Sequence, residues 1–288
     1  MSIEIKNLTY TYMKKTAFEC TALKNVSIAI KEGTFTAIAG HTGSGKSTLV
    51  QHLNGILQPG QGCVLVDGVD LSGKDSKALA ARRKVGVVFQ YPEHQLFEET
   101  IERDIAFGPK NMGIPETEVD ERVKEAMDFV GLEYEKFRER SPFELSGGQK
   151  RRVAIAGVIA LRPKYLILDE PTAGLDPCGK EMLLERIIKL RKKEKLTIVL
   201  ISHNMDDIAR LCDRIIVLDR GQVLIDEAPK TAFFKEKELK QAGLAMPQLM
   251  QLMVKLKDNG LPIDDLAQFS LENSVNDIMK ALKRRKVC

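Results

Sequence analysis

The chain has 288 residues, of which 43% are hydrophobic and 29% are charged, the composition of an ordinary globular protein. Its longest nearly uninterrupted apolar stretch, residues 153–161, falls well short of the ~20 residues of a membrane-spanning helix, and the first residues lack the pattern of a secretory signal. A net charge of +4 with mostly scattered basic residues indicates no nucleic-acid-binding arm. We therefore expect a cytosolic protein that neither crosses a membrane nor binds nucleic acid.

The five cysteines are spread widely along the chain and form neither a C-x-x-C motif nor a cysteine and histidine ligand pattern. Such cysteines are expected to be reduced thiols, which agrees with a cytosolic location. They are Cys20, Cys63, Cys178, Cys212 and Cys288.

Residues 34–39 are apolar and β-prone and lead directly into a G-x-x-x-x-G-K-S motif, after which we expect a helix to begin near Lys46. The glycines allow successive backbone N–H groups to turn inward around a β-phosphate, and the helix presents its positive N-terminal end to the same anion. Lys46 should reach the β- and γ-phosphates of a nucleoside triphosphate, and Ser47 should ligate magnesium. The predicted nucleotide-binding residues of this segment are Gly40, His41, Thr42, Gly43, Ser44, Gly45, Lys46, Ser47 and Thr48.

Hydrolysis requires a second element that holds magnesium and positions water. Four apolar residues, 165–168, predict a buried strand that ends in Asp169 and Glu170. We expect Asp169 to bind the magnesium shell and Glu170 to polarise the attacking water. The alternative, in which the two carboxylates start a helix, is disfavoured because the loop-forming residues 171–176 follow them.

Residues 145–149 read L-S-G-G-Q, which resembles the signature of ABC ATPases without a mismatch. Ser146 is expected to cap a helix over about residues 149–161, whose N-terminal N–H groups form a second anion site. The resemblance implies that the signature of one subunit closes over the ATP held by the other, so that two subunits enclose two nucleotides. The signature residues expected at that nucleotide are Ser146, Gly147, Gly148 and Gln149.

Three further positions match ABC ATPase motifs. Gln90 follows the expected strand 85–89 and resembles the Q-loop glutamine, which contacts magnesium and water and reports the nucleotide state to the membrane partner. His203 follows the expected buried strand 196–202 and resembles the switch histidine that contacts the γ-phosphate, while Asp176 matches the D-loop aspartate, which works across the dimer interface. The resemblance therefore implies catalytic roles for Glu170, His203 and Gln90, and magnesium contacts from Ser47, Gln90 and Asp169.

An aromatic residue near the N-terminus completes the expected nucleotide site. Tyr12 resembles the family's aromatic that stacks on adenine. Tyr10 lies two residues earlier and would share the same face of a strand, so it remains the alternative to the preferred Tyr12.

The resemblance implies an α/β fold, a P-loop NTPase of the ABC cassette type with a RecA-like core, an antiparallel β layer and a helical subdomain. The sequence agrees, with strands and turns up to about residue 90 and helical periodicity over about 91–163, notably at 116–129. Apolar strands then alternate with charged helices such as 179–194. We assign residues 1–232 to the ABC ATPase domain and 233–288 to a C-terminal helical extension.

The extension goes beyond what a minimal ABC module needs. It is expected to contain helices at residues 233–241, 246–257 and 274–285. One apolar face with near-helical spacing indicates a packing or subunit surface rather than a ligand site. Its members are Leu249, Met250, Leu252, Met253 and Leu256.

Several segments resemble the ATP-binding subunits of energy-coupling factor transporters, most closely their second type: residues 40–48, 89–100 and 141–145, and a tail with 241–244 and Pro247. Tyr91 and His94 depart from the residues expected there. The resemblance implies the uptake of vitamins or similar micronutrients by a heterodimer with a first-type ATPase, although a homodimer remains open. It also implies a transmembrane scaffold whose helices insert beside residues 90–100, and an exchangeable substrate-binding membrane subunit. The chain would lie at the cytoplasmic face of the cell membrane and use ATP and Mg²⁺.

Three other functions remain as alternatives. The chain could be the ATPase of a conventional ABC transporter. A soluble ABC protein that clamps nucleic acid or ribosomes would usually carry two cassettes or a long inserted coiled coil, and the sequence has neither. A regulator that binds nucleotide without turnover is disfavoured because Glu170 and His203 are both present.

Overall fold

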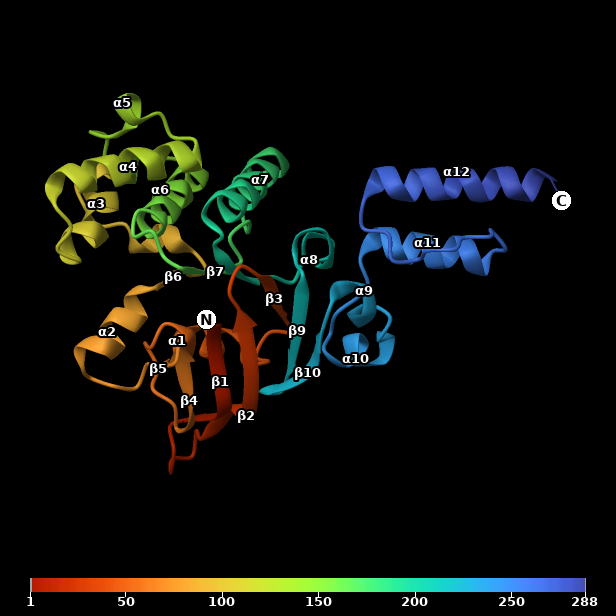
Figure 1. The fold of residues 1–288 in the computed structure, drawn as a ribbon, viewed down its shortest axis with the longest axis horizontal. Coiled ribbons are helices and arrows are strands. Elements are labelled where there is room, and N and C mark those ends of the chain that lie inside the picture. The colour runs from red at the N-terminus through yellow and green to blue at the C-terminus, as the bar shows by residue number, and fades with distance from the viewer. Residues whose placement is uncertain (1, 288) are drawn as a thin grey trace.

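The computed structural model describes residues 2–287, apart from the side chains of residues 285–287, and has two β-sheets at its centre (Figure 1). The smaller sheet is antiparallel, with strand order β2-β1-β4-β5. It confirms the predicted antiparallel layer. Its strands are β1 (Ser2–Tyr12), β2 (Cys20–Lys31), β4 (Gln61–Val66) and β5 (Val69–Asp70).

The larger sheet has six strands in the order β10-β9-β3-β8-β7-β6. Five of them run parallel, and β10 pairs antiparallel with β9 at one edge. Every residue of β3, β7 and β8 is buried, as expected for parallel strands that are covered on both faces. The strands are β3 (Phe35–Ala39), β6 (Val85–Val88), β7 (Tyr165–Asp169), β8 (Thr197–Ile201), β9 (Arg214–Asp219) and β10 (Gln222–Glu227).

The larger sheet separates two apolar cores. Successive side chains of a strand point to opposite faces, so Tyr165 and Ile167 join the core beneath the antiparallel sheet, and Leu166 and Leu168 join the core beneath the helices. The helices of the cassette outside the 91–163 segment are α1 (Lys46–Leu53), α2 (Ser76–Arg83), α7 (Pro177–Glu194) and α8 (Met205–Leu211).

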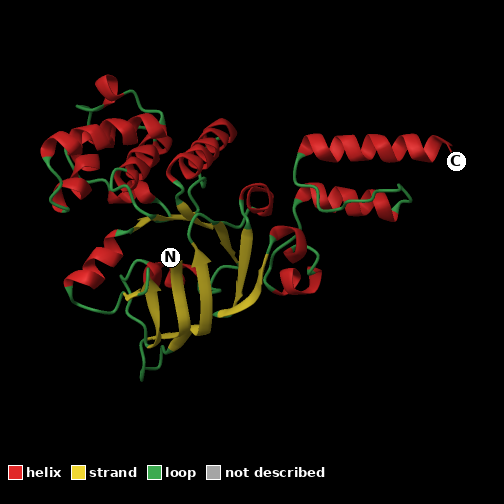
Figure 2. Ribbon diagram, viewed as in Figure 1, coloured by secondary structure: helices red, strands yellow, loops and turns green. Residues whose placement is uncertain are grey.

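Between β6 and β7 the described chain is helical or looped, and its helices cluster together above the end of β6 (Figures 1 and 2). The expected helix at residues 116–129 is present as α4, while the signature helix α6 begins at Gly147 and ends at Ile159, two residues earlier at each end than the 149–161 expected. The helices are α3 (Ile101–Asn111), α4 (Glu116–Val130), α5 (Tyr134–Phe137) and α6 (Gly147–Ile159), with short 3₁₀ turns at Pro92–Gln95 and Pro142–Glu144.

The expected helix 233–241 is present but starts three residues later, at Glu236, because residues 233–235 form a turn after α9 (Pro229–Ala232). Phe233, in this turn, is fully buried and packs edge-on against Phe269, with ring centroids 5.8 Å apart. The helices found are α9 (Pro229–Ala232), α10 (Glu236–Gln241), α11 (Gln248–Asp258) and α12 (Leu271–Val287).

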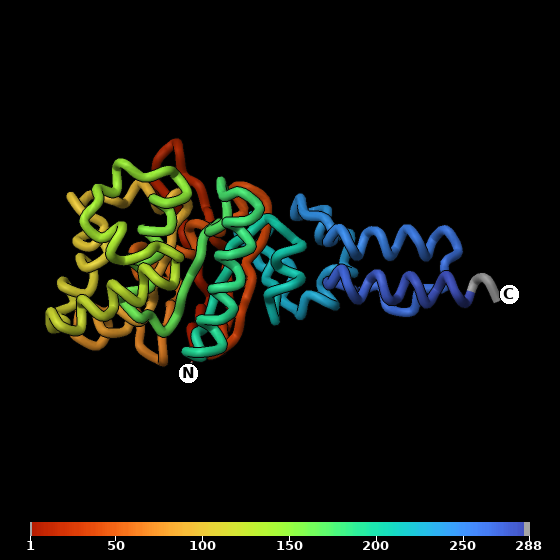
Figure 3. Tube along the Cα trace, turned by 90° about the horizontal axis from the view of Figure 1, so that it is seen from above, coloured from red at the N-terminus to blue at the C-terminus, as the bar shows by residue number. Residues whose placement is uncertain are grey.

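The extension packs in two parts. Leu239 and Met250 belong to the large core under the helices, whereas Met253 starts a separate small core between α11 and α12. This helical pair projects away from the cassette (Figure 3). The predicted apolar face is a packing surface at Met250 and Met253, whereas Leu252 is 45% exposed.

No helix in residues 2–287 is both long and apolar enough to cross a bilayer. Among these residues Cys20, Cys63, Cys178 and Cys212 are free thiols, and Cys288 lies outside the described residues.

Candidate functional site

The predicted site residues follow the carboxyl ends of the parallel strands. The loop 40–45 follows β3, Glu170 follows β7, His203 follows β8 and Gln90 follows β6. Because β3 lies between β8 and β9, the loop is flanked by the ends of these two strands. Open α/β sheets bind ligands at this edge.

The phosphate loop has a backbone that only glycine tolerates at two positions. Gly40 has φ 149° and Gly45 has φ 107°, and a Cβ atom would lie 2.3 Å from the Leu218 carbonyl oxygen at the first and 2.7 Å from the Ala22 carbonyl oxygen at the second. Gly43, at φ 82°, has open space around the same position. The loop backbone is therefore tightly enclosed at Gly40 and Gly45 and open at Gly43.

Two polar groups of the loop fit an anion. The Lys46 ammonium donates to the carbonyl oxygens of Gly40 and His41 at 2.8 and 2.9 Å, which holds it inside the loop. The Ser44 hydroxyl is buried, and within residues 2–287 it has no hydrogen-bond partner. Burial lowers the pKa of Lys46, against the opposing effect of the Glu170 and Asp169 charges. A bound phosphate would compensate the buried ammonium.

The two carboxylates after β7 have different surroundings. Asp169 is buried, and its burial, with the nearby Glu170 charge, raises the pKa of Asp169 to about 6, although Lys46 opposes the shift. Glu170 has φ 49°, a backbone conformation that costs energy for a residue with a side chain. Such strain at the end of a buried strand is typical of a functional position.

Glu170 and His203 are in direct contact. The Nδ1 atom of His203 lies 2.7 Å from Oε1 of Glu170, and the His203 backbone N–H donates to the same oxygen at 3.0 Å. The Glu170 side chain is 12% exposed and the His203 side chain is 77% exposed. The carboxylate is thus fixed while the imidazole stays open to a ligand.

Tyr12 and Tyr10 contact each other edge-on, with ring centroids 4.8 Å apart. Tyr10 packs on the buried His52 ring and the core beneath the antiparallel sheet. Tyr12 is 37% exposed and its hydroxyl lies 3.2 Å from the Thr48 hydroxyl, beside the phosphate loop helix. Tyr12 is therefore the better placed of the two to meet a base.

The signature forms a complete helix cap, as predicted. The Ser146 hydroxyl accepts the Gln149 backbone N–H at 3.3 Å, and the Gln149 side chain accepts the Ser146 N–H at 3.0 Å. Within residues 2–287 no hydrogen bond or ion pair links this helix start to the phosphate loop of the same chain. Asp176 caps α7, accepting the Gly179 N–H at 2.7 Å.

Gln90 is exposed at the start of the segment that follows β6. In the described chain no hydrogen bond joins it to Glu170 or to the phosphate loop, so only the position of β6 in the sheet places it at this edge.

The residues after Gln90 pack locally. Tyr91 and His94, which depart from the residues expected there, stack on each other with ring centroids 5.9 Å apart. Glu93 receives the buried Arg151 guanidinium from the signature helix at 3.2 and 3.3 Å.

Asp219, at the end of β9, was not among the predicted residues but lies beside the phosphate loop. Its carboxylate contacts the His41 ring at 3.0 Å and accepts a bond from Gln241 of the extension at 2.7 Å. Like Asp169, Asp219 ends an apolar strand, which the sequence shows, but its place beside the loop depends on strand order.

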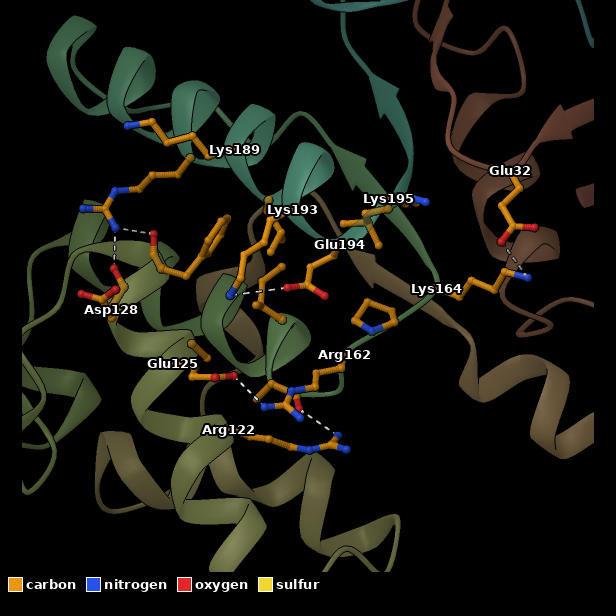
Figure 4. Close-up of a pocket in the computed structure, with 18 residues that line it drawn as sticks. Glu32, Arg122, Glu125, Asp128, Arg162, Lys164, Lys189, Lys193, Glu194 and Lys195 are labelled. Carbon is orange, nitrogen blue, oxygen red and sulfur yellow. Dashed lines mark hydrogen bonds and ion pairs between the residues drawn. The ribbon is translucent and has the colours of Figure 1, made fainter. Parts of the chain in front are cut away.

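A cavity of about 950 Å³ lies elsewhere, between α4, the end of α6 and α7 (Figure 4). Some of its charged side chains pair with each other, as Arg162 does with Glu125 at 2.7 Å and Lys193 with Glu194 at 3.5 Å. None of the predicted site residues lines it. It is a cleft of mixed polar and apolar lining between the helical segment and α7.

Comparison with known proteins identifies the family. Residues 23–173, just over half of the chain, match the family model described as ABC transporter. The chain is 51% identical over 285 residues to "Energy-coupling factor transporter ATP-binding protein EcfA2" of Clostridium tetani (strain Massachusetts / E88), covering 99% of each. The chain belongs to the energy-coupling factor family of ABC transporter ATP-binding proteins. The resemblance drawn from its motifs is confirmed, and this ABC ATPase is an enzyme that hydrolyses ATP.

Solved structures confirm the fold of this ABC ATPase. It is similar to cbiO1 from Clostridium perfringens, part of the ABC transporter complex cbiONQ, with a TM-score of 0.72 and 37% identity over 90% of this chain and 96% of that one. A dimeric ATP-binding cassette in a post-hydrolysis state with ADP and Pi gives a TM-score of 0.71 and 33% identity over 79% of this chain and 98% of that one. The part of this ABC ATPase that the second structure does not cover is about as long as residues 233–288.

Proposed function

We propose that this ABC ATPase is the ATP-hydrolysing subunit of an energy-coupling factor importer that powers the uptake of vitamins or similar micronutrients. The observation that carries the proposal is the match to EcfA2 over 99% of the chain, extension included. A conventional ABC importer explains the cassette but gives no reason for a match over the extension. Nothing in the described residues favours a clamp on nucleic acid or ribosomes.

In the proposed nucleotide site, the N–H groups of loop 40–45 and the Lys46 ammonium bind the phosphates, and Tyr12 stacks on adenine. Positive charge and unpaired N–H groups at the start of α1 favour the same anion. The buried Ser44 hydroxyl supports this assignment because a phosphate oxygen would satisfy it.

The residues present also fit Mg²⁺. Within residues 2–287 no cluster of three or more histidine, cysteine or acidic side chains forms a complete metal site. Mg²⁺ is commonly held by one or two carboxylates together with substrate phosphates and water, and Asp169 with Ser47 and Gln90 would supply the protein's share. When bound, the ion would neutralise charge on the phosphate oxygens. The buried Asp169 carboxylate, with its raised pKa, would gain a counter-charge.

In the proposed hydrolysis step, Glu170 accepts a proton from the attacking water and aligns it for in-line attack on the γ-phosphate. His203, held by Glu170 at 2.7 Å, turns its exposed ring toward the γ-phosphate, and Gln90 orients the water. Positioning and electrostatic stabilisation by these fixed groups account for most of the acceleration in phosphoryl transfer.

A second ABC ATPase completes the site in this proposal. Residues 146–149 make no polar contact with the phosphate loop of their own chain, and the capped start of α6 is exposed. A partner's phosphate loop would bring ATP against it. We propose a heterodimer with a first-type ATPase, with a homodimer as the other possible pairing.

The proposed contact with the transmembrane scaffold is the set of exposed aromatic residues in the segment after Gln90 and on α3. Phe97 is 56% exposed and meets Phe107, 44% exposed, edge-on at 4.8 Å, and Tyr91 is 51% exposed. Exposed aromatic clusters of this kind mark protein interfaces. The scaffold and an exchangeable substrate-binding subunit would hold this ABC ATPase at the cytoplasmic face of the membrane.

The test is affinity purification of the tagged chain from its native membrane, followed by identification of what is recovered and an ATPase assay. We expect a second ABC ATPase and a multispanning scaffold. A Phe97→Ser, Phe107→Ser variant should lose the scaffold and keep the second ATPase. The matched control is Phe18→Ser, which changes an exposed phenylalanine in the β1–β2 hairpin and should keep both.

Other outcomes separate the alternatives. Recovery of an ordinary pair of membrane subunits with no exchangeable substrate-binding protein would favour a conventional ABC transporter. Recovery of ribosomes or nucleic acid would overturn the transport function and leave the ATPase assignment intact.

A further inference from the structure

The C-terminal extension touches the phosphate loop through one buried carboxylate. Asp219 is 7% exposed and lies between two side chains from distant parts of the chain. Its Oδ1 atom is 3.0 Å from Nε2 of His41, and its Oδ2 atom accepts a hydrogen bond from the Gln241 amide at 2.7 Å. One side chain at the end of β9 therefore connects α10 with the loop.

His41 connects Asp219 with Lys46, the residue proposed to bind the phosphates. Its Nδ1 atom lies 2.7 Å from the Thr42 carbonyl oxygen, so each ring nitrogen lies against an acceptor oxygen, and which of them donates depends on the tautomer. Its own carbonyl oxygen accepts the Lys46 ammonium at 2.9 Å. The phosphates themselves need no particular side chain at this position of the loop motif, so the contact with Asp219 supplies a reason for histidine here.

Gln241 is an exposed residue, but the backbone on either side of it is anchored in the core. It ends α10, whose Leu239 is buried in the large core, and Ala242 beside it is fully buried. Gly243, at φ 67°, turns the chain back, and a Cβ atom there would lie 3.5 Å from Cβ of His41. The extension thus reaches the loop with its backbone as well as with the Gln241 side chain.

Because the Asp219 carboxylate is negatively charged and lies beside the phosphate loop, its orientation affects how the loop binds an anion. The Gln241 bond is the largest of the effects that lower the pKa of Asp219, with His41 adding to it and burial opposing it. Without Gln241, one oxygen of a buried carboxylate would lose its donor next to a loop that binds phosphate, and rearrangement of Asp219 would disturb His41.

We propose that Gln241 and Asp219 are positioning residues that fix the phosphate loop through His41, so that the C-terminal extension sets the affinity of this ABC ATPase for ATP. The inference rests on the proposed binding of ATP at residues 40–48. The extension would strengthen ATP binding without touching the nucleotide.

The test compares three full-length variants assembled with their partner subunits. Gln241→Leu removes the amide, Gln241→Lys keeps a donor for Asp219, and Gln251→Leu is the matched control because the Gln251 amide bonds only the Met246 carbonyl in the described extension. The measurements are the ATP dissociation constant, KM and kcat. We expect Gln241→Leu to raise the dissociation constant and KM about 5-fold or more, the lower end of typical coupling between sites, with kcat within about 2-fold. Gln241→Lys should restore both constants, and Gln251→Leu should leave them unchanged.

A double-mutant cycle checks the route through the loop. In a His41→Ala background, the additional Gln241→Leu change should have no further effect on ATP affinity, because the connection is already cut. Equal losses from Gln241→Leu and Gln251→Leu would overturn the inference, because they would indicate a general loss of stability. Unchanged affinity in Gln241→Leu, with normal ATP binding by the wild type, would overturn it and leave the proposed function standing. Absence of ATP binding by the wild type would overturn both.

Discussion

The Glu170 carboxylate receives both the imidazole and the backbone N–H of His203 on one oxygen, at 2.7 and 3.0 Å. Two adjacent parallel strands, β7 and β8, bring the pair together. One Glu170 oxygen is thereby occupied, so the other is the oxygen available to a water. Because the Glu170 backbone has φ 49°, its position depends on these contacts as well as on the strand.

The first prediction concerns the replacement Glu170→Gln. The amide oxygen can still accept both bonds from His203, so the geometry and ATP binding should be retained. The group that accepts the proton is lost, and general-base catalysis is typically worth about 10²- to 10⁴-fold, so turnover should fall by orders of magnitude. Equilibrium ATP binding and steady-state ATPase activity of the assembled complex measure the two effects.

The matched control is Glu181→Gln, which changes a glutamate that pairs with Arg210 on the surface at 2.8 Å. It should alter neither binding nor turnover. Undiminished turnover in Glu170→Gln would refute the assignment of Glu170 as the base.

The second prediction separates Tyr12 from Tyr10. Base–aromatic stacking is worth about 1–3 kcal/mol, so Tyr12→Ala should weaken ATP binding about 5- to 150-fold, whereas Tyr12→Phe keeps the ring and should bind nearly normally. Tyr10→Ala should instead lower the free energy of unfolding, because Tyr10 packs on His52 and the core. ATP titration and denaturant unfolding of all three variants decide the question. A reversed pattern would transfer the base-stacking role to Tyr10.

The phosphate loop, the carboxylates after β7 and the Ser146 cap could be predicted because their determinants are local. Glycines at fixed spacing dictate a loop, an apolar run that ends in Asp169 and Glu170 dictates a buried strand and its end, and Ser146 three residues before Gln149 forms a capping box. In each case residues close in sequence determine the geometry.

The contact of His41 with Asp219 could not be predicted because it depends on strand order. The two residues are 178 positions apart, and they meet only because β9 lies next to β3. Strand order is set by how the whole chain packs. The turn at Phe233 could likewise not be predicted, since Phe233 is buried against Phe269, a residue distant in the sequence.

The third prediction compares a buried ion pair with an exposed one. Arg151 of the signature helix is 3% exposed and pairs with Glu93, whereas Arg103 pairs with Glu99 on the surface at 2.8 Å. Breaking a fully buried pair costs about 3–5 kcal/mol, an upper bound here because the Glu93 side chain is 20% exposed, and an exposed pair contributes about 0–1 kcal/mol. Urea unfolding should therefore show a much larger loss for Arg151→Met than for Arg103→Met. Equal losses would mean that the pair does not hold the Gln90 segment to the signature helix.

The fourth prediction concerns the acid stability contributed by Asp67, which joins the two sheets. Its side chain is 4% exposed and accepts bonds from the Tyr165 hydroxyl at 2.6 Å, Lys84 at 2.8 Å and Lys164 at 3.1 Å. Burial alone would raise the pKa of Asp67, but the bonds from Lys84, Tyr165 and Lys164 outweigh it and lower the pKa to about 2.

Because the pKa of Asp67 is lower in the folded state than in the unfolded state, its stabilisation is complete above about pH 5 and is lost as the pH falls toward about 2. At neutral pH, Asp67→Asn should reduce the free energy of unfolding by about 2 kcal/mol, and this difference from the wild type should shrink steadily below about pH 4. The matched control is Asp70→Asn, in the same β4–β5 hairpin, where the carboxylate accepts the Ser72 N–H at 2.8 Å. Its free energy of unfolding should follow that of the wild type at a constant difference across the same pH range. Denaturant unfolding at a series of pH values measures all three curves, and a difference between Asp67→Asn and the wild type that stays constant from pH 7 to pH 3 would mean that the Asp67 charge does not hold the sheets together.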